Sequence, residues 1–480
     1  MSQTARELAT NSPAHAPIER DEITAYVDRS WDELFGMDRA EVETFQLTAS
    51  RRRLEGLAPK VQMLKAQADD VGIAQIEKLD DVVPLLFQDA LYKSYPLSLI
   101  EKNRYDLLTE WLGRLTSLDL SVIDVSGVAS IDGWLNELEA QSPLQIYHTS
   151  GSSGKLSFFP RSTLESELWF ETVVKAYAGF SAEPGVRLGR GGARMAVILP
   201  SWRYGRAVAQ RNLRFFEKYV APAPEQIYTL TNGTISADLI SLSGRIRLAQ
   251  AKGELDQMKL SDAQRLALKR YLEELDRRPA ESSAFFRRIA DELAGRRVYL
   301  QCSQYLMYES AAAGLERGLN HLFAPDSVGA SGGGAKGREL PENWADIVSE
   351  FTGISHWGRR YGMTELIGPM VRCPQDRYHI PPYYIAFQLN PETGVVLPRE
   401  GVVTGRFAFL DLLAQTHWGG IISGDRVTIE WDTHCSCGRK GAFLHDDVVR
   451  YSELITGEDK LTCATTIDNT DAALKLLIDI

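Results

Sequence analysis

Hydrophobic positions in the first third of the chain recur every three or four residues, which is the period of an amphipathic helix. Between residues 42 and 68 these positions fall on one helix face: Leu54, Leu57, Val61 and Leu64. The stretch 107–115 has the same helical character through its leucines and Trp111. The polar N-terminus contains Pro13 and Pro17, so we expect a loose tail there. The pattern predicts a helical lead-in over residues 1–140.

Short apolar runs bounded by turn residues predict strands that are buried on both faces, as in a sheet covered by helices. Residues 195–200 form one such run and residues 298–300 form another. The charge-rich segment from about 240 to 296 is predicted to be a helical insertion with a solvated face. We expect further helices over residues 164–177, 306–324 and 341–352. The region 141–370 therefore reads as an α/β core.

The residues after the first expected strand are candidates for a ligand pocket. Open α/β sheets bind ligands at the carboxyl ends of their strands, and Ser201 to Arg206 follows the run 195–200. Trp202, Tyr204 and Arg206 could form pocket walls, and ordinary packing explains them equally well.

The pattern changes to strands in residues 371–450. The stretch 402–410 is apolar, and Val427, Ile429 and Trp431 alternate with polar residues in the stretch 421–431. We expect a small β-rich subdomain here, which makes the whole chain an α/β protein.

Composition narrows the possible partners. The chain of 480 residues is 44% hydrophobic and 24% charged, as in ordinary globular proteins, and its formal net charge is −11. An acidic chain argues against a nucleic-acid or anionic-membrane partner, since either would favour a basic face. No apolar run approaches the length of a membrane span, and the N-terminus has no signal-like apolar segment. Five cysteines fit reduced thiols, so we expect a cytoplasmic protein.

The segment Thr149–Lys155 is the strongest candidate for chemistry in the sequence. It packs four hydroxyl residues, two glycines and a lysine into seven positions. Such a segment can cradle a phosphate through backbone N–H groups, hydroxyls and the lysine charge. It is not the P-loop of nucleoside triphosphatases, because Leu156 stands where Ser or Thr is required and Thr149 where the first glycine is required. A polar surface loop explains this segment alone equally well.

Three later stretches add chemistry. Residues 331–337 are dense in glycine, so a flat ligand or its backbone could lie against them. Residues 360–365, RYGMTE, place an aromatic ring, a hydroxyl and a carboxylate close together. In Ser423-Gly424-Asp425, the carboxylate could accept two ribose hydroxyls, although an Asx turn is the commoner explanation.

Taken in order, these motifs and Arg450 resemble the acyl-adenylate-forming superfamily, which includes acyl-CoA and aryl-CoA ligases, peptide-synthetase adenylation domains and luciferases. The Y-G-x-T-E motif matches without departure. The run from Cys435 to Arg450 is most similar to the phenylacetate-CoA ligase branch, and acyl-protein synthetases of bacterial luminescence are also similar. The resemblance spans roughly residues 140 to 465. It implies a large N-terminal domain with a barrel-like β-rich subdomain.

The resemblance also implies roles for the motif residues. The loop over the ATP pyrophosphate would be formed by Thr149, Ser150, Gly151, Ser152, Ser153, Gly154 and Lys155. Gly332, Gly333 and Gly334 would lie along the adenine, and Tyr361, followed by Gly362 and Met363, would stack on it. Thr364 would bond the α-phosphate and Glu365 would bind Mg²⁺. Asp425 and Arg450 would hold the ribose hydroxyls.

The C-terminus departs from the family pattern. In the family, a hinge leads to a mobile domain that carries a catalytic lysine. Here the hinge is expected near Asp459-Lys460, so residues 451–480 read as a hinge stub and the mobile domain as truncated. Either Lys460 or Lys475 replaces the lysine, another protein supplies the domain, or the phosphate loop acts alone.

Three cysteines and a histidine could converge in the β-rich region. Cys373, His379, Cys435 and Cys437 have the ligand types of a closed structural zinc site. His434 competes with His379 for the fourth position. Two buried thiols beside unrelated histidines are the alternative.

The resemblance implies ATP- and Mg²⁺-dependent activation of a small carboxylic acid, aromatic rather than fatty, followed by acyl transfer to a thiol or amine acceptor such as CoA, a carrier protein or an amine. One alternative is an acyl-protein synthetase that forms an acyl-enzyme on Cys463. The competing interpretation of Cys463 is a buried thiol of the hinge region. Another is a nucleotide-binding relative without turnover. We also leave open that the protein is a homodimer.

Overall fold

The computed structural model describes residues 20–149, 154–180, 186–255, 258, 260, 262–331 and 340–451. The chain folds into two compact units. The first unit comprises Met1–His148, Ser157–Thr172 and Tyr361–Asp459, and the second comprises Thr149–Leu156, Val173–Arg360 and Lys460–Ile480. Both units combine helices with sheets, so the expected α/β class is confirmed. The division into four consecutive segments stays a prediction.

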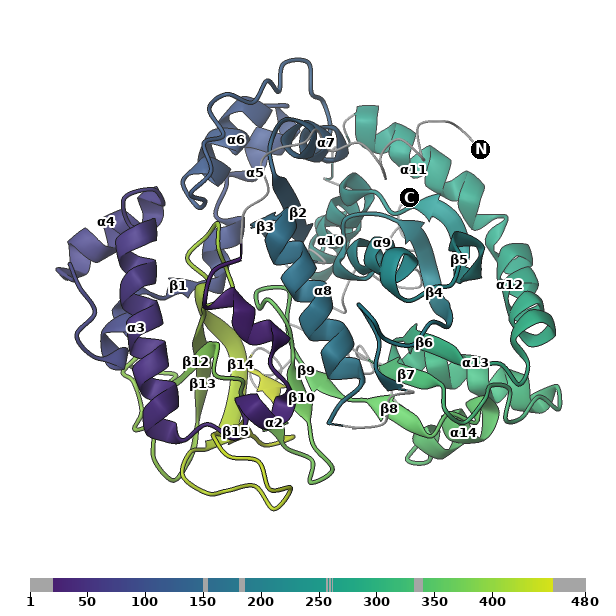
Figure 1. Ribbon diagram of the computed structural model, residues 1–480. Coiled ribbons are helices and arrows are strands. Elements are labelled where there is room, and N and C mark those ends of the chain that lie inside the picture. Colours follow the sequence, from purple (N-terminus) through teal and green to yellow (C-terminus); the bar gives the residue numbers. More distant parts are fainter. Residues whose placement is uncertain are drawn as a thin grey trace. The chain divides into compact units, whose positions relative to one another are not determined.

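The N-terminal part of the first unit is helical, as the periodicity predicts (Figure 1). The expected helix over residues 42–68 is interrupted between Leu57 and Gln62, because Pro59 lacks the N–H group that would continue the helical hydrogen bonds. The helices and 3₁₀ turns here are η1 (Thr24–Asp28), α2 (Trp31–Leu34), α3 (Arg39–Leu57), α4 (Gln62–Val71), η2 (Leu79–Leu85), η3 (Asp89–Lys93), α5 (Leu97–Glu101), α6 (Tyr105–Gly113) and α7 (Ile131–Gln141).

A sheet of nine described strands forms the core of the first unit. Its central strands are antiparallel, with β13 (Val402–Asp411) between β12 (Tyr384–Leu389) and β14 (Gly420–Glu430). The strands expected over 402–410 and 421–431 are therefore present. The remaining strands are β1 (Phe87–Gln88), β9 (Arg360–Tyr361), β10 (Met370–Arg372), β11 (Tyr378–His379), β15 (Phe443–Leu444) and β16 (Val449–Arg450).

Strand β14 connects distant parts of the sequence. Its register places Phe87 of β1 beside Ile421 in a parallel pair, and Asp425 beside Arg450 of β16 in an antiparallel pair. The helical lead-in thus contributes a strand to the β-rich sheet, which the periodicity did not predict.

A separate hairpin joins β2 (Leu144–His148) to β3 (Phe158–Ser162). Both strands are buried along their whole length. The predicted phosphate loop is the connection between them. The helix α8 (Thr163–Tyr177) follows β3 directly, close to the predicted bounds.

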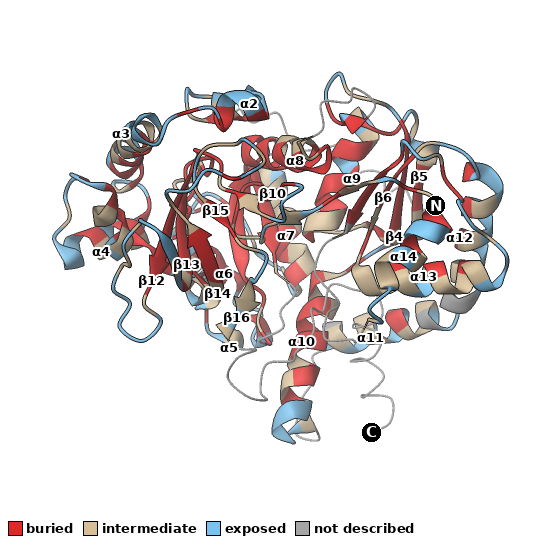
Figure 2. Ribbon diagram, turned by 90° about the horizontal axis from the view of Figure 1, so that it is seen from below, coloured by how far each residue is buried: buried red, intermediate tan, exposed pale blue. Residues whose placement is uncertain are grey.

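The second unit contains a parallel sheet in the order β5-β4-β6-β7-β8. Helices cover both faces of this sheet, and its three central strands are largely buried (Figure 2). In β6, Val298 and Leu300 pack in the cluster that includes α12, α13 and α14, whereas the Tyr299 ring lies 4.6 Å from that of Phe216 in α9. The alternation confirms a strand buried on both faces. The strands are β4 (Ala196–Tyr204), β5 (Ile227–Thr234), β6 (Val298–Cys302), β7 (Val328–Ser331) and β8 (His356–Gly358).

The helices of this unit occupy the expected segments with shifted ends. The segment of about 240 to 296 holds three helices, and the helix expected over 306–324 ends earlier. Their bounds, with the 3₁₀ turn η5 (Pro224–Gln226), are α9 (Val208–Tyr219), α10 (Ala237–Lys252), α11 (Asp262–Leu275), α12 (Arg278–Leu293), α13 (Gln304–Glu316) and α14 (Trp344–Thr352).

The strand expected over residues 195–200 is longer than its apolar run. It continues to Tyr204, and Trp202 within it is 2% exposed. Packing, rather than a pocket wall, therefore accounts for Trp202. Among the described helices, none is both long and apolar enough to cross a membrane.

Candidate functional site

The motif Y-G-M-T-E lies in the first unit, between strands β9 and β10. Tyr361 ends β9, and Met370 begins β10. We call the intervening turn from Thr364 to Gly368 the T-E loop. Thr364 and Glu365 are half-buried, while Leu366 and Ile367 are buried completely. The apolar half of the loop anchors it in the core and leaves the polar half closer to the surface.

Residues from three distant motifs meet beside this loop. The Tyr361 hydroxyl donates a hydrogen bond to Asp425 Oδ2 at 2.6 Å. The register of β14 and β16 sets Arg450 against Asp425, with 3.6 Å between Arg450 Nε and Asp425 Oδ1. Burial raises the pKa of Tyr361 well above its usual range, and the charge of Asp425 adds to this effect. The tyrosine is therefore a neutral donor to the carboxylate.

Glu365 belongs to the same electrostatic neighbourhood. Burial raises the pKa of its carboxyl group, and the charges of Asp425 and Asp89 raise it further. A hydrogen bond from its own backbone N–H and the charge of Arg450 oppose the rise. A carboxylate surrounded by other acidic groups would be stabilised by a bound cation. Glu365 thus fits the expected Mg²⁺ ligand in chemical type.

Three side chains that the sequence analysis did not single out hold the T-E loop in place. Arg161 donates to the carbonyl oxygens of Thr364 and Leu366, the second at 2.8 Å. Asp411 accepts from the Ile367 N–H, and the Tyr384 hydroxyl lies within hydrogen-bond distance of the Ile367 and Gly368 carbonyls. The sequence carries one signal for Arg161, which is a charge directly after the apolar residues Phe158 to Pro160.

A buried carboxylate, that of Glu165, fixes the chain that follows Asp411. Glu165 and His417 are both fully buried, with 3.1 Å between Glu165 Oε1 and His417 Nδ1. Burial alone would raise the pKa of Glu165, but hydrogen bonds from His417, Thr416 and Gln415 outweigh it and hold this pKa well below its usual range. Glu165 therefore stays ionised and anchors the segment 415–417 to the start of α8.

The predicted phosphate loop is described only at its ends. Thr149 and Lys155 are half-buried, and Gly154 is buried with φ of +81°. A Cβ atom at Gly154 would lie 2.9 Å from Leu248 Cδ2 of α10, and the positive φ is a backbone conformation that favours glycine. Ser150, Gly151, Ser152 and Ser153 lie outside the described residues, as do Gly332, Gly333 and Gly334. Thr149, Gly154 and Lys155 belong to the second unit, and the T-E loop belongs to the first.

The four predicted zinc ligands come together in the first unit. Cys373 and His379 lie at the ends of the β10–β11 hairpin, and Cys435 and Cys437 lie on a turn that Gly438 closes with its N–H to the Cys435 carbonyl. The ligand atoms of all four residues lie within 4.8 Å of one another. His434 is exposed and outside this group, so the structure favours His379 as the fourth member.

The spacing of this Cys3His cluster fits a single tetrahedral ion. With Zn–S bonds of about 2.3 Å, two sulfur ligands of one zinc lie about 3.7 Å apart. The Cys373 and Cys435 sulfurs are 3.7 Å apart, and Cys437 Sγ is 3.3 Å from His379 Nε2. A disulfide would require about 2.05 Å between sulfurs, and both cysteines are free.

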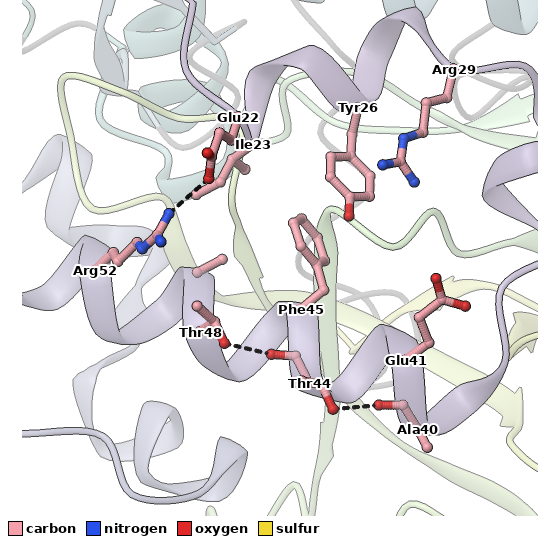
Figure 3. Close-up of a pocket in the computed structure, with 11 residues that line it drawn as sticks. Glu22, Ile23, Tyr26, Arg29, Ala40, Glu41, Thr44, Phe45, Thr48 and Arg52 are labelled. Carbon is pink, nitrogen blue, oxygen red and sulfur yellow. Dashed lines mark hydrogen bonds and ion pairs between the residues drawn. The ribbon is translucent and has the colours of Figure 1, made fainter.

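A groove of about 760 Å³ lies between η1 and α3 (Figure 3). Tyr26 and Phe45 stack inside it with ring centroids 4.1 Å apart, and Arg52 pairs with Glu22 at 3.0 Å near one end. Its lining includes none of the motif residues. The groove therefore gives no support to a nucleotide site at this place.

Comparison with known proteins adds structural likenesses. No protein-family model matches the sequence, and no curated protein matches it. An open form of 2-hydroxyisobutyryl-CoA ligase, solved with 2-HIB-AMP and CoA, is 13% identical and has a TM-score of 0.48, over 92% of this chain and 81% of the ligase. ATP-bound MatB from Rhodopseudomonas palustris is 15% identical over 64% of this chain and 51% of its own, with a TM-score of 0.32.

A luciferase-like enzyme from the mealworm Zophobas morio is 10% identical over 92% of this chain and 97% of its own, with a TM-score of 0.34. Because the TM-scores lie below 0.5, the likenesses assign neither a reaction nor site residues to this chain.

Proposed function

We propose that the protein activates a carboxylic acid with ATP, forms an acyl-adenylate with release of pyrophosphate, and passes the acyl group to a thiol or amine. The observation that carries this proposal is the convergence of Tyr361, Glu365, Asp425 and Arg450 within the first unit. An aromatic ring, two carboxylates and a cation are the groups that a ribonucleotide and its metal ion require. They come from three motifs separated by up to 89 positions in the sequence, between Tyr361 and Arg450.

The residues have distinct roles in this mechanism. Asp425 accepts the ribose hydroxyls with Arg450 beside it, and Tyr361 stacks on the adenine while its hydroxyl holds Asp425. Thr364 donates to the α-phosphate. Glu365 would hold Mg²⁺, which neutralises phosphate charge when bound. Thr149 and Lys155, with the residues between them, neutralise the leaving pyrophosphate.

The chemical step is an in-line displacement at phosphorus. An oxygen of the substrate carboxylate forms a bond to the α-phosphorus, and the bond from that phosphorus to the pyrophosphate oxygen breaks. The protein contributes through positioning and through charge stabilisation. The similarity to phenylacetate-CoA ligases favours an aromatic acid, with CoA, a carrier protein or an amine as acceptor.

We also propose that Cys373, His379, Cys435 and Cys437 bind one structural zinc ion. The 3.7 Å and 3.3 Å separations support this assignment, as does the presence of four protein ligands, which leave no open position for a substrate. The ion would join the β10–β11 hairpin to the turn at residues 435–438.

Two alternatives remain distinct from the leading proposal. Acyl transfer through Cys463 would leave a covalent acyl-enzyme, which Cys463→Ser abolishes without stopping adenylate formation. A non-catalytic relative would bind ATP or AMP and release no pyrophosphate with any acid. Cys463, Lys460 and Lys475 lie outside the described residues, together with the rest of the hinge stub after Tyr451.

An ATP–pyrophosphate exchange assay against aryl and fatty acids tests the proposal. We expect exchange that depends on an aryl acid, and its loss in Glu365→Ala. ATP binding without exchange for any acid would contradict the proposal.

A further inference from the structure

We propose that Arg161 and Asp411 are positioning residues that hold the T-E loop from two sides and so align Thr364 and Glu365. This inference rests on the proposed function of those two residues. Neither Arg161 nor Asp411 belongs to a motif of the sequence analysis, and both are 0% exposed.

Arg161 holds the first half of the loop through its backbone. One terminal nitrogen, Nη2, donates to the carbonyl oxygens of Thr364 and Leu366, which flank Glu365. The guanidinium carbon lies 4.6 Å from the centre of the Tyr147 ring and 5.3 Å from that of Trp169. These rings restrict the orientation of the planar group, so the positions of the two carbonyls are restricted as well.

Asp411 holds the second half of the loop. Its Oδ2 accepts from the Ile367 N–H, and its Oδ1 accepts from the Leu413 N–H at 2.9 Å. The Tyr384 hydroxyl, 2.8 Å from the Ile367 carbonyl and 2.7 Å from that of Gly368, fixes the same turn. Gly368 has φ of +112°, and a Cβ atom there would lie 2.3 Å from Thr172 Oγ1, so the last position of the T-E loop requires glycine.

The pattern is more specific than general stabilisation of the core. Hydrogen bonds to charged groups are stronger than neutral ones, and here they end on three backbone groups of one short loop, the carbonyls of Thr364 and Leu366 and the N–H of Ile367. A displacement of about 1 Å at a reacting group can slow a reaction by about 10²-fold. The two side chains therefore control the placement of Thr364 and Glu365 without touching the nucleotide themselves.

Arg53 provides a matched control. It is another buried arginine of the first unit, 8% exposed, and it donates to the carbonyls of Ala414, His417 and Trp418 rather than to the T-E loop. Replacement of either arginine by lysine keeps a positive charge near Asp411 and removes guanidinium hydrogen bonds from the same core, so Arg53→Lys is the control for Arg161→Lys. A purely structural effect should therefore appear equally in both arginine variants.

The experiment compares Arg161→Lys, Arg161→Met, Asp411→Asn and Arg53→Lys with the wild-type chain. Hydrogen–deuterium exchange of the full-length protein reads out residues 362–368 without substrate. We expect protection there to fall about tenfold or more in Arg161→Met and Asp411→Asn, less in Arg161→Lys, and to stay unchanged in Arg53→Lys. In pyrophosphate exchange we expect kcat to fall about 10²-fold in Arg161→Met, with a less than about threefold change in KM for ATP.

The outcomes separate the two proposals. Loss of protection confined to residues 362–368 supports the positioning role, even if the wild-type chain shows no exchange and the proposed function fails. Unchanged protection in both Arg161→Met and Asp411→Asn would overturn the positioning role. So would equal loss throughout the first unit, or the same loop effect in Arg53→Lys.

Discussion

At the scale of single residues, Asp425 has the most direct consequence for ligand recognition. Its carboxylate already accepts one hydroxyl, that of Tyr361, and lies beside the Arg450 guanidinium. The side chain is 12% exposed, so a hydroxyl-bearing ligand can reach it only in a defined direction. A carboxylate placed in this way should discriminate between ligands by their hydroxyl groups.

We predict that the wild-type chain binds ATP about 10- to 100-fold more tightly than 2′,3′-dideoxy-ATP, because hydrogen bonds to a charged group contribute about 1.5–3 kcal/mol. Asp425→Ala should weaken ATP binding by a similar factor and leave dideoxy-ATP binding nearly unchanged. Titration calorimetry with both nucleotides measures this. Equal discrimination in the wild type and the variant would show that Asp425 does not bind the ribose.

Asp411 gives a second prediction at this scale. Burial raises the pKa of its carboxyl group to about 6, although the N–H groups of Ile367 and Leu413 and the charges of Arg161 and Arg53 favour the ionised form. The folded state thus binds a proton more readily than the unfolded state, whose aspartate pKa is about 3.9. The contribution of Asp411 to the free energy of unfolding is therefore complete below about pH 4 and falls as the pH rises through about 6.

Urea unfolding of the wild type and of Asp411→Asn between pH 4 and 8 isolates the pH dependence that Asp411 contributes, because the two proteins share all other titrating residues. We predict that the free energy of unfolding of the wild type, relative to the variant, falls by about 2–3 kcal/mol over this range. Parallel pH profiles for the two proteins would refute the assignment.

At the scale of elements, the Cys3His cluster explains how a short N-terminal helix is held. The Phe35 ring, at the end of α2, lies 5.3 Å from the His379 ring, and the Lys440 N–H donates to the Phe35 carbonyl at 2.9 Å. Lys440 Nζ also pairs with Asp38 at 2.6 Å. Through neighbouring residues, the turn that carries Cys435 and Cys437 therefore joins the Cys3His cluster to the segment 30–38.

We predict one zinc ion per purified chain, its loss in Cys435→Ser, and its retention in Cys302→Ser, whose buried thiol lies in the second unit. Loss of the ion should lower the thermal midpoint and expose residues 30–38 to protease, because metal binding contributes directly to folding. Metal analysis and limited proteolysis measure the two effects. Less than stoichiometric zinc in the wild type, or full zinc in Cys435→Ser, would exclude the site.

Some elements could be predicted from sequence because their signal is local. The apolar runs at 195–200 and 298–300 are β4 and β6, and the alternation at Val427 and Ile429 lies within β14. The contact between Arg161 and the T-E loop could not be predicted in the same way, because Thr364 lies 203 positions after Arg161 in the sequence. In the folded chain Arg161 is buried and donates hydrogen bonds to backbone carbonyls of this distant segment.

For the candidate site, the sequence indicates residue types but not the contacts between them. The motif residues Tyr361 and Asp425 followed from their order in the chain, but their direct hydrogen bond depends on the register of β14. The choice of His379 over His434 depends on the β10–β11 hairpin, which directs one imidazole toward the cysteines. The chemical type of a side chain can be read from the sequence. Which side chains contact one another across a sheet depends on the register of its strands.

At the scale of the whole molecule, each unit is assembled from three separate segments of the chain. The predicted phosphate loop and the T-E loop fall in different units, although a single reaction is proposed for both. The proposed reaction therefore requires that the chain as a whole couple ATP cleavage to activation of an acid. Activity of the intact protein, rather than of a fragment, is the relevant observation.

The most direct measurement follows the phosphates of ATP in a single turnover with an aryl acid that supports pyrophosphate exchange. If no acid supports exchange, each aryl and fatty acid of the exchange assay is tested in turn. We predict that label in the α-phosphate of ATP appears in an acyl-adenylate, that label in the γ-phosphate leaves as pyrophosphate, and that Glu365→Ala forms neither product. Label from the γ-phosphate on the acid, or bound ATP that yields no labelled adenylate with any acid, would contradict the account.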